Sequence, residues 1–135
     1  ELTLYDIMKR SADPPADRIA DGNAREWVTG FERAFRAADA LLAAKGPVGD
    51  RTARLFLELL AGRPDTLIAI QQGSETAHSV AQRAAETARE VDADGDLTAA
   101  EELAESFVAA GYNPGTTADL TAAALFIALQ RGLSV

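Results

Sequence analysis

The sequence predicts an all-α protein, an irregular bundle of six to eight helices around a central, apolar C-terminal helix. Apolar residues recur every three or four positions along most of the chain, as expected for amphipathic helices. No segment shows the alternating, β-branched pattern that is typical of strands. Glycine and proline interrupt the helical pattern at several points, and these interruptions set the expected number of helices.

The N-terminal third is predicted to hold a short helix and then a long one. Apolar residues at helical spacing begin at Leu4, and the two prolines at residues 14–15 end that segment. The second helix spans residues 23–45, because its apolar positions recur at helical spacing until the glycine and proline that follow. Trp27 and Phe31 lie on this apolar stripe, which predicts that both are core residues.

Three further helices are predicted in the middle of the chain. Residues 50–60, with Asp50 as the N-cap, are so densely apolar that this helix should lie deep in the core. Pro64 is well placed as the first residue of the next helix, which ends at Gly73. Ser74 then caps a helix that carries small apolar residues on its inner face as far as residue 91.

The acidic segment of residues 90–101 has two interpretations. Its carboxylates at the third and fifth positions, glycine at the sixth and glutamate at the twelfth follow the EF-hand pattern, which predicts a Ca²⁺ site. Glu90, however, occupies the first position, where the loop favours the shorter aspartate. The alternative is a solvated connection in which Thr98 and Glu101 form a capping box for a helix that Gly111 ends. We prefer the connection and keep a calcium-binding, non-catalytic helical module as the alternative function.

Length and charge limit the other classes of function. The 135 residues predict a single helical domain, residues 1–135, which we expect to be the C-terminal part of a longer chain. The net charge of −8 disfavours nucleic acid and anionic membranes as partners. The chain has no cysteine, which excludes disulfides and thiolate zinc sites and fits a cytoplasmic setting. No apolar run is long enough to span a membrane. The oligomeric state stays open, a homo-oligomer included.

The turn of residues 113–119 is the most informative segment for function. Pro114 and Gly115 favour a tight turn, and two threonines follow where the last helix, about residues 117–131, begins. Free amides and the positive end of the helix dipole make such a turn a candidate site for a phosphate. The alternative needs no ligand: Thr116 caps the helix and Asp119, three residues later, completes a capping box.

The only histidine, His78, has no second histidine with which to form a metal site. We expect an exposed or hydrogen-bonded side chain without a catalytic role. A serine–histidine–aspartate triad lacks the Gly-x-Ser-x-Gly turn that would support it.

Residues 111–126 resemble the signature near the C-terminus of the triphosphoribosyl-dephospho-CoA synthase family, where an (Asn/Ser)-Pro-Gly-(Gly/Thr)-(Ser/Thr)-Ala-Asp-Leu turn precedes an apolar helix. Residues 64–67 and the following Gly73 are similar to that family's Asp-Thr-Asn segment. Residues 4–6 and the helix from Trp27 to Phe35 are similar to archaeal-type members. The resemblance covers roughly the C-terminal half of a family member.

This resemblance implies a transferase that moves the triphosphoribosyl group of ATP onto the 2′-hydroxyl of dephospho-CoA and releases adenine. Glycosyl transfer of this kind benefits from a carboxylate that accepts the hydroxyl proton or stabilises the ribosyl cation, and Asp65 and Asp119 are the candidates. Mg²⁺ is expected with ATP, with Asp119 as a ligand. The residues predicted to bind the phosphates are Asn113, Gly115, Thr116 and Thr117.

Overall fold

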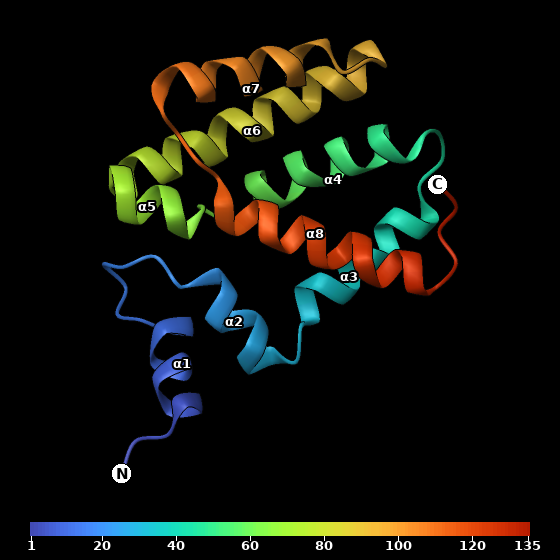
Figure 1. The fold of residues 1–135 in the computed structure, drawn as a ribbon. Helices are drawn as coiled ribbons and strands as arrows, with labels where there is room; N and C mark the ends of the chain where they lie inside the picture. Colours follow the sequence, from blue (N-terminus) through green and yellow to red (C-terminus); the bar gives the residue numbers. More distant parts are fainter.

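Eight helices and no strands make up the fold, in a computed structural model that describes residues 1–135. This confirms the predicted all-α bundle of six to eight helices. None of the helices is long and apolar enough to cross a lipid bilayer. In chain order (Figure 1) the helices are α1 (Leu4–Ala12), α2 (Gly22–Thr29), α3 (Glu32–Ala43), α4 (Val48–Gly62), α5 (Thr66–Gln72), α6 (Ser74–Asp94), α7 (Thr98–Ala110) and α8 (Gly115–Gln130).

Helix α4 lies between two apolar clusters. Its Leu55 and Leu59 pack with α3 and α8 in the first cluster. Its Leu57 and Leu60 pack with α5, α6 and α7 in the second. Because α4 is apolar on both sides, α3 and α8 can pack on one side of it and α6 on the other, while α7 packs on α6, as Figure 1 shows. The dense apolar pattern of this helix therefore predicts its central position correctly.

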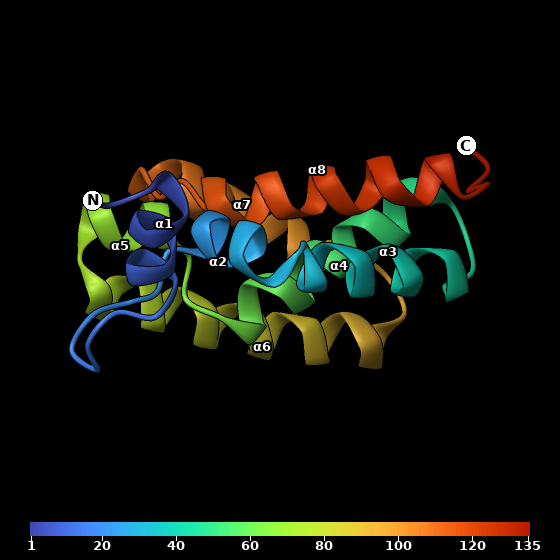
Figure 2. The ribbon, with the colours of Figure 1, turned by 90° about the horizontal axis from the view of Figure 1, so that it is seen from below.

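Helix α8 is buried on one side only. Ala124 and Ala128 are fully buried against the first cluster, and their small side chains let α8 approach its neighbours closely. Phe126, on the opposite side, is 64 % exposed. Seen from below, α8 runs along one edge of the bundle rather than through its middle (Figure 2). The expectation that the other helices enclose α8 therefore holds for one face of this helix and fails for the other.

The long helix predicted for residues 23–45 is two helices. Gly30 and Phe31 both have left-handed backbone angles, with φ of 70° and 63°, and their amides both donate to the Glu26 carbonyl. The apolar spacing continues across the break, which is why periodicity alone predicts one helix. Trp27 is 60 % exposed, so its predicted core position is wrong. It packs edge-on against the half-buried Phe31, with 5.0 Å between the ring centroids.

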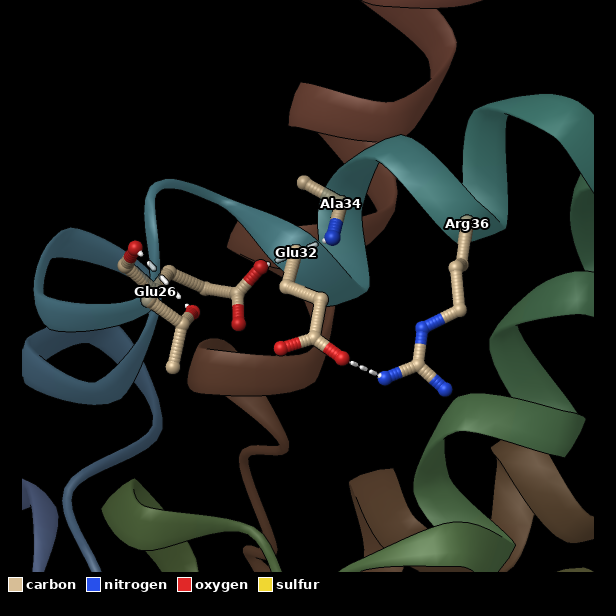
Figure 3. A network of polar contacts seen from close by, with 5 residues as sticks. Glu26, Glu32, Ala34 and Arg36 are labelled. Atoms are coloured by element: carbon tan, nitrogen blue, oxygen red, sulfur yellow. Dashed lines mark hydrogen bonds and ion pairs between the residues drawn. The ribbon is translucent and has the colours of Figure 1, made fainter.

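Glu26 supplies the N-cap that α3 lacks in its own sequence. The residue before α3, Phe31, has no side chain that can accept a hydrogen bond. The buried Glu26 side chain instead accepts a hydrogen bond from the Ala34 amide, at 2.7 Å from its Oε1 (Figure 3). In the same first turn of α3, Glu32 forms an exposed ion pair with Arg36, which lies one turn later. The break between α2 and α3 is therefore held by a buried carboxylate.

The acidic segment does not form a calcium loop. Helix α6 continues to Asp94, so the carboxylates of residues 90–94 spread around a helix instead of converging on one point. Asp92 pairs with Arg54 of α4, at 3.4 Å. The chain holds no group of three or more acidic or histidine side chains that could bind a metal ion. The structure therefore gives no support to the calcium-binding alternative.

Several predicted helix caps differ from those in the structure. Asp96, not Thr98, accepts the hydrogen bond at the start of α7, and this bond from the Thr98 amide lowers the pKa of the Asp96 carboxyl. Asp50 lies in the first turn of α4 because that helix begins at Val48. Helix α5 begins at Thr66, two residues after the predicted first residue Pro64, and Asp65 caps it. Helix α6 begins at Ser74, with Gly73 in the cap position predicted for Ser74.

Gly111 ends α7 in a left-handed conformation, with φ of 73°, and directs the chain toward α8. Gly111→Ala should lower the free energy of unfolding by about 1–2 kcal/mol, because an L-residue is strained at this backbone angle. Gly49→Ala is the matched control, since a Cβ at either glycine would meet no atom within 4 Å and Gly49 lies in the first turn of α4. There alanine should raise stability by about 0.5 kcal/mol. Urea denaturation of both variants measures the difference, and equal midpoints would contradict this reasoning.

Candidate active site where three helix ends meet

The N-terminal ends of α2, α5 and α8 meet at one place in the fold (Figure 1). The Gly22 amide donates to the Thr66 hydroxyl at 2.9 Å, which joins α2 to α5. The Thr117 amide donates to the Asp65 carboxylate at 2.7 Å, which joins α8 to α5. Gly22 permits close contact between α2 and α8, because a Cβ at this position would lie 2.8 Å from Cγ2 of Thr116. Three segments far apart in the sequence therefore share one site.

Asp65 holds two of these helix ends. Its side chain is 2 % exposed. Oδ1 accepts hydrogen bonds from the amides of Leu67 and Ile68, at 2.9 and 3.1 Å, and so caps α5. Oδ2 accepts from both the amide and the hydroxyl of Thr117, each at 2.7 Å. This carboxylate therefore satisfies donors of α5 and of α8 at the same time, which fixes the start of α8 relative to α5.

A cleft of about 350 Å³ opens beside this meeting point. Thr66 and Thr116 line it from α5 and α8, and the carboxylates of Glu26 and Asp65 contribute to its wall. The other charged groups of its lining are cationic. Arginines reach the cleft from the loop before α2, from α2, from α3 and from the connection between α4 and α5: Arg18, Arg25, Arg33 and Arg63. We call this cavity the arginine cleft.

None of the four arginines of the cleft pairs with a carboxylate. The ion pairs of the chain use other arginines, namely Arg36, Arg54 and Arg131. Within the cleft, Arg33 donates to the Leu59 carbonyl at 2.6 Å, while Glu26 is engaged by the Ala34 amide. In a chain with 21 acidic residues, this gathering of unpaired guanidinium groups is a local reversal of the overall charge.

Burial and mutual repulsion act on these guanidinium groups. Burial lowers the pKa of Arg33, and the neighbouring Arg63 lowers it further. Burial also lowers the pKa of Arg63, and Arg25 adds to the effect. Glu26 raises the pKa of both arginines, but its effect is smaller than the combined effect of burial and the neighbouring arginines. Since an arginine stays protonated at neutral pH, the cleft holds uncompensated positive charge.

Asp119 lies one turn into α8 and is exposed. Its Oδ2 accepts a long hydrogen bond of 3.5 Å from the side-chain amide of Asn23, the second residue of α2. Asp119 lines two shallow hollows next to the arginine cleft, and Asn23 borders both of them and the cleft. Thr116 also separates the cleft from one of these hollows. The buried carboxylate of Asp65 and the exposed one of Asp119 therefore lie on adjoining parts of one surface.

Comparison with known proteins identifies the family. The sequence profile of the family described as CitG, ATP:dephospho-CoA triphosphoribosyl transferase, matches residues 1–134. The chain belongs to this triphosphoribosyl transferase family. A crystal structure from Archaeoglobus fulgidus, assigned as a triphosphoribosyl-dephospho-CoA synthase, matches 99 % of the chain with 31 % identity and a TM-score of 0.78. The chain spans 55 % of the length of that relative. A comparison with curated proteins finds no match.

The turn that carries the resemblance to the transferase family offers fewer free donors than its sequence suggests. Both donors of Thr117 are engaged by Asp65. The Gly115 amide donates to the Asn113 carbonyl at 2.8 Å. The Thr116 amide has no acceptor within the chain, and Thr116 lines the arginine cleft. The predicted capping box between Thr116 and Asp119 does not form, since no side chain of α8 itself caps this helix.

Sequence analysis of this transferase-family chain missed the arginine cleft. The four arginines are spread over residues 18–63 without a common spacing, so no stripe of charge marks them. One signal was available: Arg63 directly precedes the Pro-Asp-Thr segment that resembles the family motif. His78 is exposed on α6, as expected, but it also lines the cleft, which the sequence did not indicate.

Proposed function

We propose that the polypeptide carrying this sequence moves the triphosphoribosyl group of ATP onto the 2′-hydroxyl of dephospho-CoA, with release of adenine. The family match across residues 1–134 is the observation that carries the proposal. The assignment of the relative from Archaeoglobus fulgidus agrees with it. Because this chain spans about half of that relative, we ascribe the reaction to the polypeptide at its natural length.

The chemistry benefits from a carboxylate near the ribose. The oxygen of the 2′-hydroxyl forms a bond to C1′ of the ATP ribose, while the bond from C1′ to the adenine nitrogen breaks. The hydroxyl proton passes to a base, and positive charge develops on the ribose in an oxocarbenium-like transition state. Asp119 fits this role, because it is exposed and its only hydrogen bond in the chain is the long one from Asn23.

The other predicted residues take supporting roles in this proposal. Asp65, the second predicted catalytic carboxylate, fits a positioning role better, since its two oxygens already accept four hydrogen bonds. Thr117 is the partner through which Asp65 holds α8 in place. Asn113, Gly115 and Thr116 form the turn beside the substrate, and the unpaired Thr116 amide is the donor that a phosphate oxygen could use.

Mg²⁺ fits this surface as a companion of the nucleotide rather than as a resident ion. The chain has no cluster of three or more acidic or histidine side chains, so no ready-made cage exists. Mg²⁺ commonly binds one or two carboxylates together with substrate phosphates, and Asp119 is the exposed carboxylate at the right place. When bound, the ion would neutralise charge on the phosphates.

Release of adenine tests the proposal directly. The polypeptide at its natural length is incubated with ATP, Mg²⁺ and dephospho-CoA, and free adenine and the mass of the coenzyme product are measured. We expect adenine and product in equal amounts, and neither when the acceptor lacks its 2′-hydroxyl. No adenine from ATP, under conditions where the protein is folded, would overturn the proposal.

A further inference from the structure

We propose that the arginine cleft binds a linear triphosphate, the polyphosphate end of the nucleoside triphosphate donor. The inference rests on the proposed function for the identity of the nucleotide. The existence of a polyphosphate site rests on the structure of the cleft alone. The cleft is distinct from the turn of residues 113–117, which the sequence suggests as the phosphate site.

The arginines of the cleft lack a counter-ion within the chain. A buried or half-buried arginine ordinarily pairs with a carboxylate, because desolvating an unpaired charge is costly. Of the four arginines that line this cleft, Arg25 and Arg33 are half-buried and the other two are more exposed, and none of the four has a carboxylate partner, in a chain with an excess of acidic residues. The carboxylates in the lining are occupied, Asp65 by four donors and Glu26 by the Ala34 amide. The missing anion is therefore expected to be a ligand.

The guanidinium groups of the cleft repel one another. Burial is the main cause that lowers the pKa of Arg33 and of Arg63, and repulsion by a neighbouring arginine, Arg63 for Arg33 and Arg25 for Arg63, lowers each value further. The fold keeps these guanidinium groups close together despite their repulsion. An anion bound between them would be attracted to each of them and would offset this repulsion. Arginine also presents paired N–H donors that match the oxygens of a phosphate. Side chains arranged in this way fit a phosphate chain better than a single carboxylate ligand.

The number of cations in the cleft suits a triphosphate better than a diphosphate. The triphosphate of ATP carries about four negative charges near neutral pH, since a terminal phosphate loses its second proton near pH 6. The diphosphate bridge of dephospho-CoA lacks a terminal phosphate and carries only about two. Arginines from four separate segments surround a cleft of about 350 Å³. A longer and more highly charged chain can contact more of them at once.

The position of the cleft indicates how a bound nucleotide would be oriented, with its phosphates in the cleft and its ribose toward Asp119. Asn23 and Thr116 border the cleft, and Asp119 lies on the far side of them. A nucleotide whose phosphates contact Arg25 and Arg63 can therefore extend past this border and place its ribose beside Asp119. The unpaired amide of Thr116 lies along this path.

Binding of inorganic tripolyphosphate, measured by titration calorimetry without Mg²⁺, tests the inference. Arg25→Gln and Arg63→Gln are the informative variants, because neither side chain makes a hydrogen bond or ion pair within the chain. Each should weaken binding about tenfold or more, which matches the loss of one charged hydrogen bond. Arg89→Gln on α6 removes the same charge outside the cleft and should change the affinity by less than about twofold.

Three further readouts complete the experiment. Melting temperatures of Arg25→Gln and Arg63→Gln should equal or exceed that of the unmodified protein, because each change removes repulsion. Pyrophosphate should bind at least about tenfold more weakly than tripolyphosphate, and ATP should displace tripolyphosphate better than dephospho-CoA does. Equal affinities of the cleft variants and Arg89→Gln for tripolyphosphate would overturn the inference, as would a preference for pyrophosphate.

The result can be separated from the fate of the proposed function. Tripolyphosphate binding that depends on Arg25 and Arg63, without adenine release, would keep the polyphosphate site and reject the transferase reaction. Adenine release with an unchanged KM for ATP in Arg25→Gln and Arg63→Gln would keep the reaction and reject the site.

Discussion

Replacement of Asp65 by asparagine should lower the free energy of unfolding by about 3 kcal/mol, one of the two largest effects that we expect from a single substitution. The side chain is 2 % exposed, so water cannot replace a lost partner. Asparagine has one acceptor oxygen where aspartate has two. If that oxygen faces Leu67 and Ile68, the new NH₂ group opposes the Thr117 amide. If the group flips, the amides that begin α5 lose their acceptor instead. Either orientation leaves buried donors unpaired.

Chemical denaturation followed by circular dichroism measures this loss. The control is Asp119→Asn, which makes the same chemical change at an exposed carboxylate of the same surface. That variant should unfold within about 0.5 kcal/mol of the unmodified protein. If Asp65→Asn kept the original midpoint, Asp65 would not hold α5 and α8 together, and the positioning role would be lost. A released α8 should also weaken tripolyphosphate binding, because Thr116 and Thr117 line the arginine cleft.

Local sequence patterns predicted the parts of the fold that depend on residues close together in the chain. The dense apolar run in α4 predicts its place between two clusters, because a helix that is apolar on both sides must be covered on both. The break at Gly30 and Phe31 escaped prediction, since the apolar spacing continues through it. The residue that caps α3 across this break, Glu26, lies on the preceding helix. Such contacts depend on how two helices meet, which periodicity does not describe.

The candidate site was likewise predictable where it is made of short sequence motifs, and not where it depends on contacts between distant segments. The Pro-Gly turn and the Asp-Thr segment were visible in the sequence, and the fold brings them together through Asp65 and Thr117, 52 positions apart. The sequence suggested an anion site on free amides of the turn, yet Asp65 already accepts the Thr117 donors. The arginine cleft was invisible, because its arginines come from four segments with no shared spacing. Only the tertiary packing of these four segments makes the arginines neighbours.

Replacement of Asp119 by asparagine should reduce the rate of adenine release by about 10²- to 10⁴-fold, the contribution typical of a general base. Asparagine keeps the size of the side chain and removes the charge that accepts a proton and stabilises a ribosyl cation. Tripolyphosphate binding should persist, since Asp119 does not line the arginine cleft. Steady-state assays of adenine release should therefore show a fall in kcat that exceeds any change in KM for ATP.

Asp119→Glu separates chemistry from packing in this experiment. It restores a carboxylate on a longer side chain at an exposed position, so it should recover part of the lost rate and leave the melting temperature unchanged. A merely structural role would produce the opposite order, with asparagine tolerated as an isostere and glutamate harmful. Full activity of Asp119→Asn would remove Asp119 from the reaction. The base would then have to be sought among the other acidic groups near the cleft, where Glu26 and Asp65 are buried and already hydrogen-bonded. Asp21 shares a hollow with Asp119 but caps α2 through the Ala24 amide. Asp119 is thus the carboxylate of this surface that caps no helix and accepts only the long bond from Asn23.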